Sequence, residues 1–285
     1  MEISIVGGDR RSLYLKELLE KDKHKVELIG FSKYRRDTTT IDKPLNKFVV
    51  GGIPFVKEGL IHTPFGDEIT LQNFKQKLTD KHILVAGGLS NIQLSCKSHD
   101  LLKNEEFLQC NALLTAEGTL QIVLSETPFS LSGSNVTIIG FGRIGSRLSS
   151  IFKHMGAKVV VVVNNQHEFN KATWSGFSVT HHQDINYVLK KSHVIINTPP
   201  RKLVSSSEDE ETKNYVIGLD NFSAINRDSL VIDVSSKPYG VHENIKNIAK
   251  TMWIGNIPGK TAPQTGAFYI KKVVDDTIKL EMAML

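Results

Sequence analysis

The sequence contains little cysteine and no long hydrophobic run. Among its 285 residues are two cysteines, Cys96 and Cys110, which form neither a CxxC pair nor a cluster with histidine. This spacing excludes a disulfide framework and does not indicate structural zinc, so we expect no bound metal. No segment reaches the roughly 18 consecutive apolar residues of a membrane-spanning helix. The first residues, M-E-I-S-I-V-G-G, enter a strand-like segment without a charged leader, so we expect a cytoplasmic protein with no membrane segment.

The sequence also has no basic run interleaved with aromatic residues. The formal net charge is +5, from 35 Lys and Arg against 30 Asp and Glu, and the basic residues are dispersed along the chain. This distribution favours a small anionic ligand over a nucleic acid. The length suffices for two domains, each with its own core.

The most informative stretch is residues 136–145, which read V-T-I-I-G-F-G-R-I-G. A β-branched, apolar strand is followed by Gly140, Gly142 and Gly145 in G-x-G-x-x-G spacing, with Phe141, Arg143 and Ile144 between them. Such a strand-to-helix turn brings backbone N–H groups against a pyrophosphate. A helical segment and a second strand, K-V-V-V-V-V, follow, so we predict a dinucleotide-binding site in a Rossmann unit.

The residue that reads the ribose in such a unit follows the second strand. Here that place is taken by Asn164 and Asn165 instead of Asp or Glu. Without a carboxylate, a 2′-phosphate is not repelled, so we expect NADP, with NAD possible because no Arg stands nearby. Thr198 and Pro199, after a strand at 194–196, and Asp233 and Ser235, after another strand, are expected at the inner half of the cofactor.

In the first 110 residues, short apolar segments alternate with helical ones, which predicts a second doubly wound parallel sheet. We predict strands at 3–6, 26–31, 48–50, 60–62, 82–86 and 107–111, with a helix at 12–21. The domains are then 1–111, for substrate, and 112–266, for dinucleotide. A long terminal helix at 267–285 is expected to pack back on the first domain. The acidic run at 205–211 is expected to be an exposed loop without chemistry.

The candidate substrate and catalytic residues lie in loops after predicted strands. Residues 7–11 (G-G-D-R-R) and 87–91 (G-G-L-S-N) offer backbone N–H groups and polar side chains suited to a carboxylate, although both are equally compatible with plain turns. The histidines at 62, 181, 182 and 242 fit no ligand pattern and receive no role. The expected substrate-binding residues are Asp9, Arg11, Ser90, Asn91, Thr115 and Thr265, and the expected catalytic residues are Lys237, Asp233 and Ser236.

Taken in order, several segments resemble those of the family formed by the A subunits of dipicolinate synthase. They are I-V-G-G-D-R-R, G-G-L-S-N, T-A-E-G-T, I-I-G-F-G-R-I-G, I-N-T-P-P, D-V-S-S-K-P and P-G-K-T-A-P-Q-T. The resemblance implies a flavodoxin-like first domain and an NADP-binding Rossmann domain of the formate/glycerate dehydrogenase type. It implies oxidation of a dihydrodipicolinate-type heterocyclic dicarboxylate to dipicolinate in sporulation. It also implies the flavoprotein-like B subunit of that synthase as partner, and we expect a homo-oligomer.

The chain departs from the family pattern at several places. Asn164 and Lys237 each stand where the family has Arg, and Gln264 stands where it has Lys. Residues 239–242 replace a Gly-Gly-x-Asp-Phe segment. Two other functions stay open. One is a D-2-hydroxyacid dehydrogenase-like oxidoreductase, although no His lies between Trp253 and Gly266; the other is a non-catalytic NADP-binding subunit.

Overall fold

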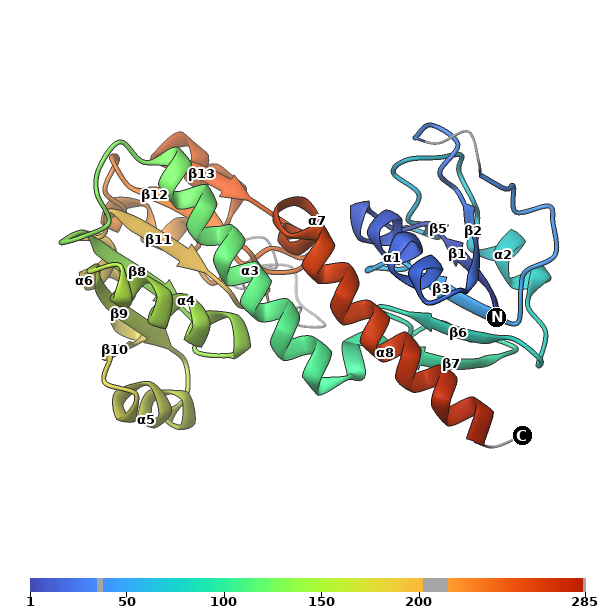
Figure 1. Ribbon diagram of the computed structural model, residues 1–285. Coiled ribbons are helices and arrows are strands. Elements are labelled where there is room, and N and C mark those ends of the chain that lie inside the picture. The colour runs from blue at the N-terminus through green and yellow to red at the C-terminus, as the bar shows by residue number, and fades with distance from the viewer. Residues whose placement is uncertain (35–37, 202–214, 284–285) are drawn as a thin grey trace. The chain divides into compact units, whose positions relative to one another are not determined.

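The computed structural model describes residues 1–34, 38–201 and 215–283. The chain divides into two compact units (Figure 1). Unit 1 comprises residues 1–111 and 258–285, and unit 2 comprises residues 112–257. No helix among the described residues is long and apolar enough to cross a membrane. The acidic run at 205–211 lies outside the described residues.

Unit 1 is built on a five-stranded sheet in which every pairing is parallel. The order is β2-β1-β3-β6-β7, which corresponds to the 2-1-3-4-5 order of flavodoxin-like folds. The predicted doubly wound fold class is therefore confirmed. The strands are β1 (Glu2–Val6), β2 (Lys25–Ile29), β3 (Phe48–Gly51), β6 (Ile83–Ala86) and β7 (Lys97–Asp100).

Two predicted strands of this sheet are wrong. The 60–62 segment contributes β5 (Leu60–Ile61), which pairs antiparallel with β4 (Val56–Lys57) in a separate hairpin. Residues 107–111 belong to the helix α3 (Glu105–Glu126). The fifth strand is instead β7, a polar edge strand whose sequence K-S-H-D carries no hydrophobic signal.

The helices of unit 1 complete its core. They are α1 (Arg10–Lys21), α2 (Leu71–Lys77), the 3₁₀ turn η1 (Leu101–Lys103), α7 (Ile257–Thr261), which begins at the boundary between the units, and α8 (Pro263–Ala283). Leu15 and Leu19 of α1 share a buried cluster with Ile270 and Val274 of α8, so the terminal helix returns to the first domain as predicted. It begins at Pro263, not at Ala267, because proline is well suited to the first helical turn.

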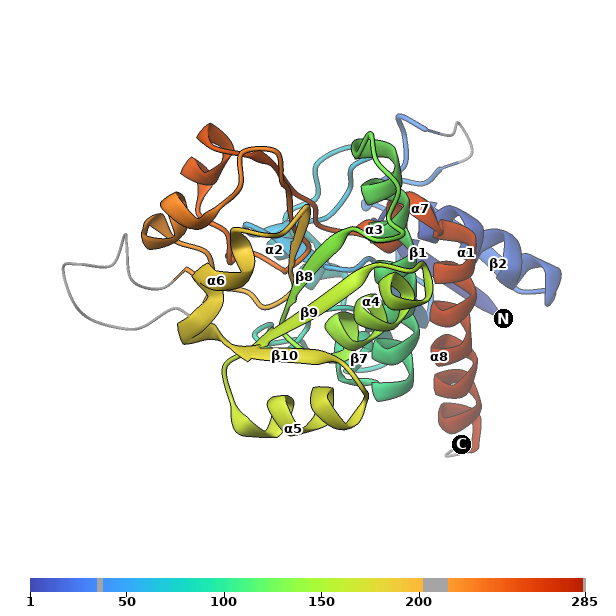
Figure 2. The same cartoon turned by 90° about the vertical axis from the view of Figure 1, so that its left-hand side faces the viewer.

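Unit 2 contains a six-stranded sheet with the order β10-β9-β8-β11-β12-β13 (Figure 2). All its pairings are parallel, and the order is the 3-2-1-4-5-6 order of dinucleotide-binding folds. The strands are β8 (Asn135–Ile139), β9 (Lys158–Val163), β10 (Ser178–His181), β11 (Val194–Asn197), β12 (Leu230–Asp233) and β13 (Lys250–Trp253).

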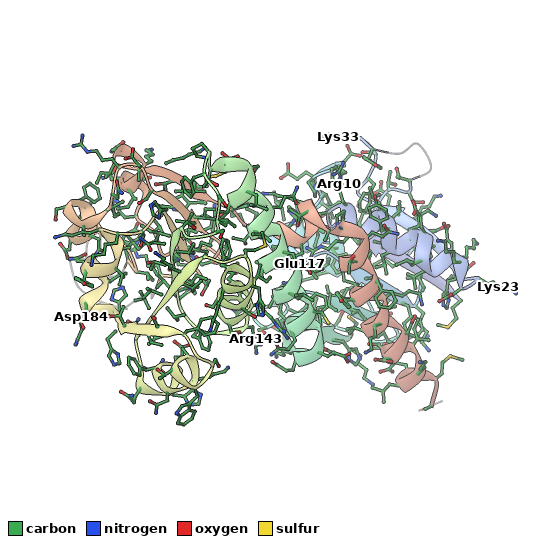
Figure 3. All side chains as sticks on the ribbon, turned by 60° about the vertical axis from the view of Figure 1, so that its left-hand side comes forward. Arg10, Lys23, Lys33, Glu117, Arg143 and Asp184 are labelled. Atoms are coloured by element: carbon green, nitrogen blue, oxygen red, sulfur yellow. The ribbon has the colours of Figure 1, made fainter. Side chains whose placement is uncertain are left out.

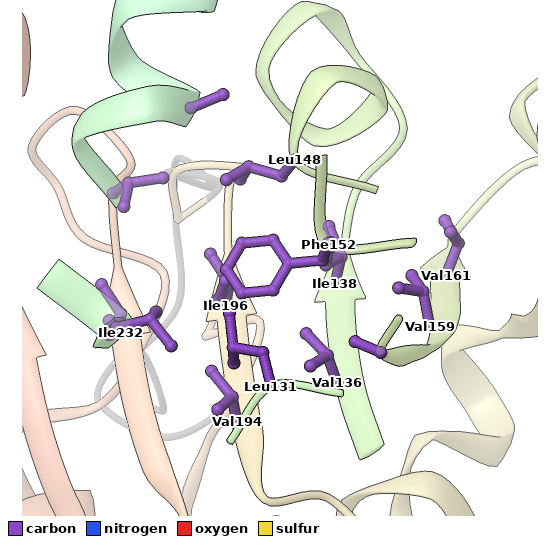
Figure 4. Close-up of a cluster of buried hydrophobic side chains, with 14 of the residues drawn as sticks. Leu131, Val136, Ile138, Leu148, Phe152, Val159, Val161, Val194, Ile196 and Ile232 are labelled. Carbon is purple, nitrogen blue, oxygen red and sulfur yellow. The ribbon is translucent and has the colours of Figure 1, made fainter. Parts of the chain in front are cut away.

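Helices cover the sheet of unit 2 and close its core. Besides α3, they are α4 (Arg143–His154), α5 (Gln166–Trp174) and α6 (Ile185–Leu189), with 3₁₀ turns at His182–Asp184, Leu219–Ala224 and Glu243–Asn247. Phe152 of α4 is fully buried among strand residues such as Ile138 and Ile196 (Figure 4). This packing fixes α4 to the sheet, and with it the glycine turn that precedes the helix.

Candidate functional site

Two glycines of the predicted dinucleotide motif are required by the fold itself. Gly140 directly follows β8 and has a φ of +88°, a conformation that favours glycine. A Cβ on Gly145 would lie 2.0 Å from the carbonyl oxygen of Gly140, so α4 could not approach β8 this closely with a larger residue. These two positions would be glycine even in a turn that binds nothing.

The fold itself does not require glycine at position 142. A Cβ at Gly142 would meet no heavy atom of the described residues within 4 Å, and the φ of −75° is accessible to any residue. Gly142 is the N-cap of α4 and supplies no side-chain acceptor, whereas Asp9 caps α1 and Asn165 caps α5 through their side chains. The open space and the helix start, marked by Arg143 in Figure 3, fit a pyrophosphate.

Thr198 locks the glycine turn to the neighbouring strand. It follows β11, and both its backbone N–H and its Oγ1 donate to the carbonyl of Ile139, at 3.1 and 2.8 Å. Its Oγ1 would lie 2.6 Å from a Cβ on Gly140, and Pro199 would be the next contact. The structure therefore brings Thr198 and Pro199 against the predicted cofactor turn.

Asn164 and Asn165 lie at the carboxyl end of β9, and both are exposed. The Oδ1 of Asn165 accepts the N–H of Glu168 at 2.8 Å and thereby caps α5. A contact with the cofactor would therefore use the amide nitrogen of Asn165. Asn164 is a separate exposed amide at the place where Rossmann folds read the ribose.

Asp233, predicted at both the cofactor and the catalytic centre, is fully buried at the end of β12. Its Oδ1 accepts from the Asn197 amide at 3.0 Å and from the Ser235 N–H at 2.9 Å, and its Oδ2 accepts from the Val241 N–H at 2.8 Å. These bonds engage both oxygens within the protein. The geometry is that of a residue that positions the loop after β12.

That loop carries the other predicted catalytic residues. Ser236 and Lys237 are exposed, whereas Ser235 is 2% exposed and its Oγ makes no hydrogen bond to a described residue. The strand end thus presents one exposed cation and one exposed hydroxyl. An ammonium group of this kind can hold a carboxylate.

Arg201 is a second cation beside this loop, and no sequence motif indicated it. Its backbone N–H donates to the carbonyl of Pro238 at 2.9 Å, so the loops after β11 and β12 are tied together. The guanidinium donates to the hydroxyl of Tyr215 at 3.0 Å and lies 4.4 Å from the centre of its ring. The available signal was the position of Arg201 directly after I-N-T-P-P.

In unit 1, the loop after β1 holds a buried ion pair. Asp9 and Arg11 are 7% and 3% exposed, and Arg11 Nη2 donates to Asp9 Oδ2 at 2.8 Å, with Nε at 3.0 Å from Oδ1. Arg11 Nη2 also donates to the Ile53 carbonyl at 3.1 Å. The structure brings the two predicted residues together, and the charge of Arg11 is already balanced by Asp9.

The loop after β6 differs from the expected anion-binding helix start. No helix follows Gly87, and Asp100 of β7 accepts the N–H groups of Gly88 and Leu89 at 2.9 and 2.8 Å. Burial raises the pKa of Asp100, but hydrogen bonds from the Gly88, Leu102 and Leu89 backbone and from Ser90 outweigh it, and the net pKa is lowered. The expected free N–H groups are therefore occupied by a carboxylate of the protein.

The remaining predicted substrate residues are dispersed within their units. In unit 1, Ser90 and Asn91 are exposed beside the Asp100 cluster, and Thr265 is exposed in the first turn of α8. In unit 2, Thr115 is 5% exposed on α3, and its carbonyl accepts from the Thr119 hydroxyl at 2.7 Å. Exposure makes the first three available to a ligand, while Thr115 is part of the packed face of its helix.

Comparison with known proteins identifies the unit that contains the glycine turn. Residues 99–255 match the family model described as D-isomer specific 2-hydroxyacid dehydrogenase, NAD binding domain. The chain belongs to this family. It is accordingly an NAD(P)-dependent oxidoreductase that uses a nicotinamide dinucleotide.

Residues 2–100 match a second model, described as the N-terminal domain of the A subunit of dipicolinate synthase. The chain is 23% identical to the A subunit of dipicolinate synthase from Bacillus subtilis strain 168, over 96% of this chain and 94% of that protein. The predicted resemblance to the A subunit of dipicolinate synthase is therefore confirmed.

Solved structures are similar over nearly the whole chain. The A subunit of dipicolinate synthase from Bacillus subtilis superposes with a TM-score of 0.80 at 22% identity, covering 100% of this chain and 98% of that one. The A subunit from Bacillus halodurans gives 0.81 at 24% identity, covering 97% of each chain. These similarities show a shared fold.

Proposed function

We propose that this protein is an NADP-dependent dehydrogenase that oxidises a dihydrodipicolinate-type heterocyclic dicarboxylate to dipicolinate during sporulation. The observation that carries the proposal is that the similarity to the A subunit of dipicolinate synthase extends over both units. A match restricted to the dinucleotide unit would support only a general dehydrogenase. We further propose a flavoprotein-like B subunit as partner and a homo-oligomeric assembly.

The cofactor would be held by unit 2. The open space at Gly142 and the first turn of α4 would receive the pyrophosphate. The exposed amides of Asn164 and Asn165 would contact the ribose or its 2′-phosphate, because no carboxylate there opposes a phosphate. The full proposed set is Gly140, Phe141, Gly142, Arg143, Ile144, Gly145, Asn164, Asn165, Thr198 and Pro199, with Asp233 and Ser235 positioning the inner loop.

A dicarboxylate substrate requires cationic and hydrogen-bonding groups at both ends. In unit 2, Lys237 and Ser236 are exposed on one loop, and Arg201 is tied to that loop through Pro238. In unit 1, we propose contacts from the loops after β1 and β6 and from the first turn of α8. The proposed residues there are Asp9, Arg11, Ser90, Asn91 and Thr265; Thr115, in unit 2, would act through the position of α3.

The chemistry asked of these residues is modest. When bound, the oxidised nicotinamide accepts a hydride from a ring carbon of the substrate. The protein must bind the two carboxylates, hold the ring in one orientation and receive one proton. This agrees with a site made of cations, hydroxyls and loops.

Calorimetric titration with NADP and with NAD, each repeated in the presence of dipicolinate, tests the proposal. We expect tight NADP binding that dipicolinate strengthens, because product and cofactor would occupy one site. Preference for NAD without any response to dipicolinate would contradict the proposal.

The family match also favours a second candidate, a D-2-hydroxyacid dehydrogenase. Such enzymes use a His just before the final helix, and no His lies between Trp253 and Gly266. Turnover of 2-hydroxy acids without any affinity for dipicolinate would support this candidate. Binding of NADP without turnover of either substrate class would indicate a protein that only binds the cofactor.

A further inference from the structure

Tyr239 lies in the loop after β12, beside a close backbone contact that leads to the glycine turn of unit 2. A Cβ on the next residue, Gly240, would lie 2.6 Å from the carbonyl oxygen of Pro199. The Cδ of Pro199 in turn lies 3.1 Å from the position of a Cβ on Gly140, the first glycine of the turn. The loop that carries Tyr239 is therefore separated from the predicted dinucleotide turn by a single residue.

The hydroxyl of Tyr239 lies near the carboxyl ends of β12 and β13, which are neighbours in the sheet (Figure 1). Its oxygen would be 3.5 Å from a Cβ on Gly255, two residues after β13. Asp233, the last residue of β12, is close enough to act on the phenol electrostatically. Parallel α/β sheets bind their ligands at this edge. Tyr239 is thus placed by the fold at the ligand-binding edge of unit 2.

The hydroxyl of Tyr239 differs from two other tyrosine hydroxyls of unit 2. Those of Tyr187 and Tyr215 each accept a hydrogen bond from a cationic side chain. The hydroxyl of Tyr239 makes no hydrogen bond to any described residue. Because Tyr239 is only half-buried, a ligand can reach it. Its hydroxyl is therefore not needed to hold the fold.

Two other polar atoms at the same strand ends also lack a partner among the described residues. They are Asn197 Oδ1 and Ser235 Oγ, and both are fully buried. Being enclosed by protein, they are not accessible to a cofactor while the loop after β12 keeps its conformation. Tyr239 is the member of this group that a ligand can contact.

The phenol of Tyr239 can act as a donor over the whole physiological range of pH. Burial raises its pKa, and the negative charge of Asp233 raises the pKa further, so the hydroxyl keeps its proton. A neutral hydroxyl that donates needs an acceptor on the ligand.

We propose that the hydroxyl of Tyr239 donates a hydrogen bond to the carboxamide oxygen of the nicotinamide. The inference rests on the proposed cofactor site of unit 2. With the ribose of the adenosine at Asn164 and the pyrophosphate at Gly142, the other end of the dinucleotide would be directed toward β11 and β12. The carboxamide oxygen is the acceptor that the nicotinamide ring itself carries. A bond to it would hold the ring in one orientation, which hydride transfer requires.

Calorimetry on the full-length protein tests the inference without turnover. Wild type and Tyr239→Phe are titrated with whichever of NADP and NAD the wild type binds more tightly. They are also titrated with the matching ADP-ribose, which lacks the nicotinamide and, for NADP, keeps the 2′-phosphate. Tyr239→Phe should weaken dinucleotide binding about fivefold to tenfold, the loss of one hydrogen bond, and leave ADP-ribose binding unchanged. Equal dinucleotide affinities, or equal losses for both ligands, would overturn the inference.

Tyr187→Phe is the matched control, because it removes the same group from α6, which leads into the amino end of β11. It should leave both affinities unchanged. Urea denaturation of Tyr239→Phe should give the wild-type free energy of unfolding, because the lost hydroxyl has no partner among the described residues. A marked loss of stability would show that the hydroxyl serves the fold and would overturn the inference.

An acetylpyridine analogue of the dinucleotide identifies the atom that Tyr239 contacts. This analogue keeps the carbonyl oxygen and has a methyl group in place of the amide nitrogen. Tyr239→Phe should weaken its binding by about the same factor, whereas a loss confined to the natural dinucleotide would overturn the assignment as donor. If wild type binds ADP-ribose as tightly as the dinucleotide, the inference fails and the proposed cofactor site stands. If neither binds, both fail.

Discussion

Gly140 and Thr198 approach each other so closely that a side chain on Gly140 would force one of them to move: a Cβ on Gly140 would lie 2.6 Å from Thr198 Oγ1. The same hydroxyl donates to the carbonyl of Ile139 at 2.8 Å. The turn is thus a packed joint between β8 and β11. Gly142, two residues on, has empty space around it, which separates the structural glycines from the one that a ligand would require.

This contrast predicts opposite effects of two substitutions. Gly142→Val should abolish NADP binding and leave the free energy of unfolding nearly unchanged, because only the ligand's space is filled. Gly140→Ala should lower the free energy of unfolding by about 2 kcal/mol or more, because of its positive φ and the contact with Thr198. Calorimetry and chemical denaturation measure both, and unchanged NADP affinity in Gly142→Val would show that the motif is only a turn.

The nature of the residue after β9 should decide the cofactor. Asn164→Asp introduces a carboxylate that repels a 2′-phosphate and accepts bonds from ribose hydroxyls. We expect NADP affinity to fall about tenfold or more, with NAD affinity equal or higher. Asn170→Asp, on α5 and away from the end of β9, is a control for the added charge. Equal losses in both variants would argue against a contact at Asn164.

Substitution of Asp233 distinguishes a positioning role of this residue from a catalytic role. Asp233→Asn keeps the size but places an amide where the carboxylate accepts from the Ser235 and Val241 N–H groups. We expect the free energy of unfolding to fall by about 2–3 kcal/mol, since a buried donor then loses its acceptor. Urea denaturation of the cofactor-free protein measures this. A variant of full stability that lacks only turnover would instead restore the catalytic assignment.

The sequence predicted most of the fold because its signals are local. Apolar strand segments alternate with helical segments in both units, and the spacing of the leucines in α1 indicates its buried face. It did not predict β7, since an edge strand with the sequence K-S-H-D buries little apolar surface. The segment at 60–62 was predicted as a strand, but its partner β4 in the hairpin was not, because two-residue strands have no detectable period.

The candidate site was predictable only in part. The glycine spacing located the dinucleotide turn, but sequence cannot tell which glycine faces open space. The loop at 87–91 has the composition of an anion site, yet Asp100, ten residues from Ser90, fills it. Arg201 had no motif around it, and its place beside the Lys237 loop comes from a contact with Pro238, which only the folded chain creates.

Asp100 should make the stability of unit 1 sensitive to acid. Its pKa is lowered in the folded state, so its bonds contribute fully above the ordinary carboxyl pKa of about 4 and are lost as pH falls through the lower folded value. Asp100→Asn should reduce the free energy of unfolding by about 1–3 kcal/mol at pH 7. The difference from wild type should shrink as the pH is lowered, as urea denaturation at several pH values would show; a constant difference would contradict the assignment.

Arg201 should contribute to recognition of a second carboxylate. Its guanidinium is oriented by the ring and hydroxyl of Tyr215, and its backbone is joined to the Lys237 loop. Arg201→Gln should weaken dipicolinate binding about tenfold to a hundredfold, the loss of one charge-assisted hydrogen bond. Picolinate, which has a single carboxylate, should lose less, and NADP affinity should stay the same. Calorimetry with the two ligands on wild type, Arg201→Gln and Arg201→Lys separates charge from geometry, because the Lys variant keeps the charge but loses the planar stack on Tyr215. Equal losses for dipicolinate and picolinate would place Arg201 at the first carboxylate, and no loss for either would remove it from the site.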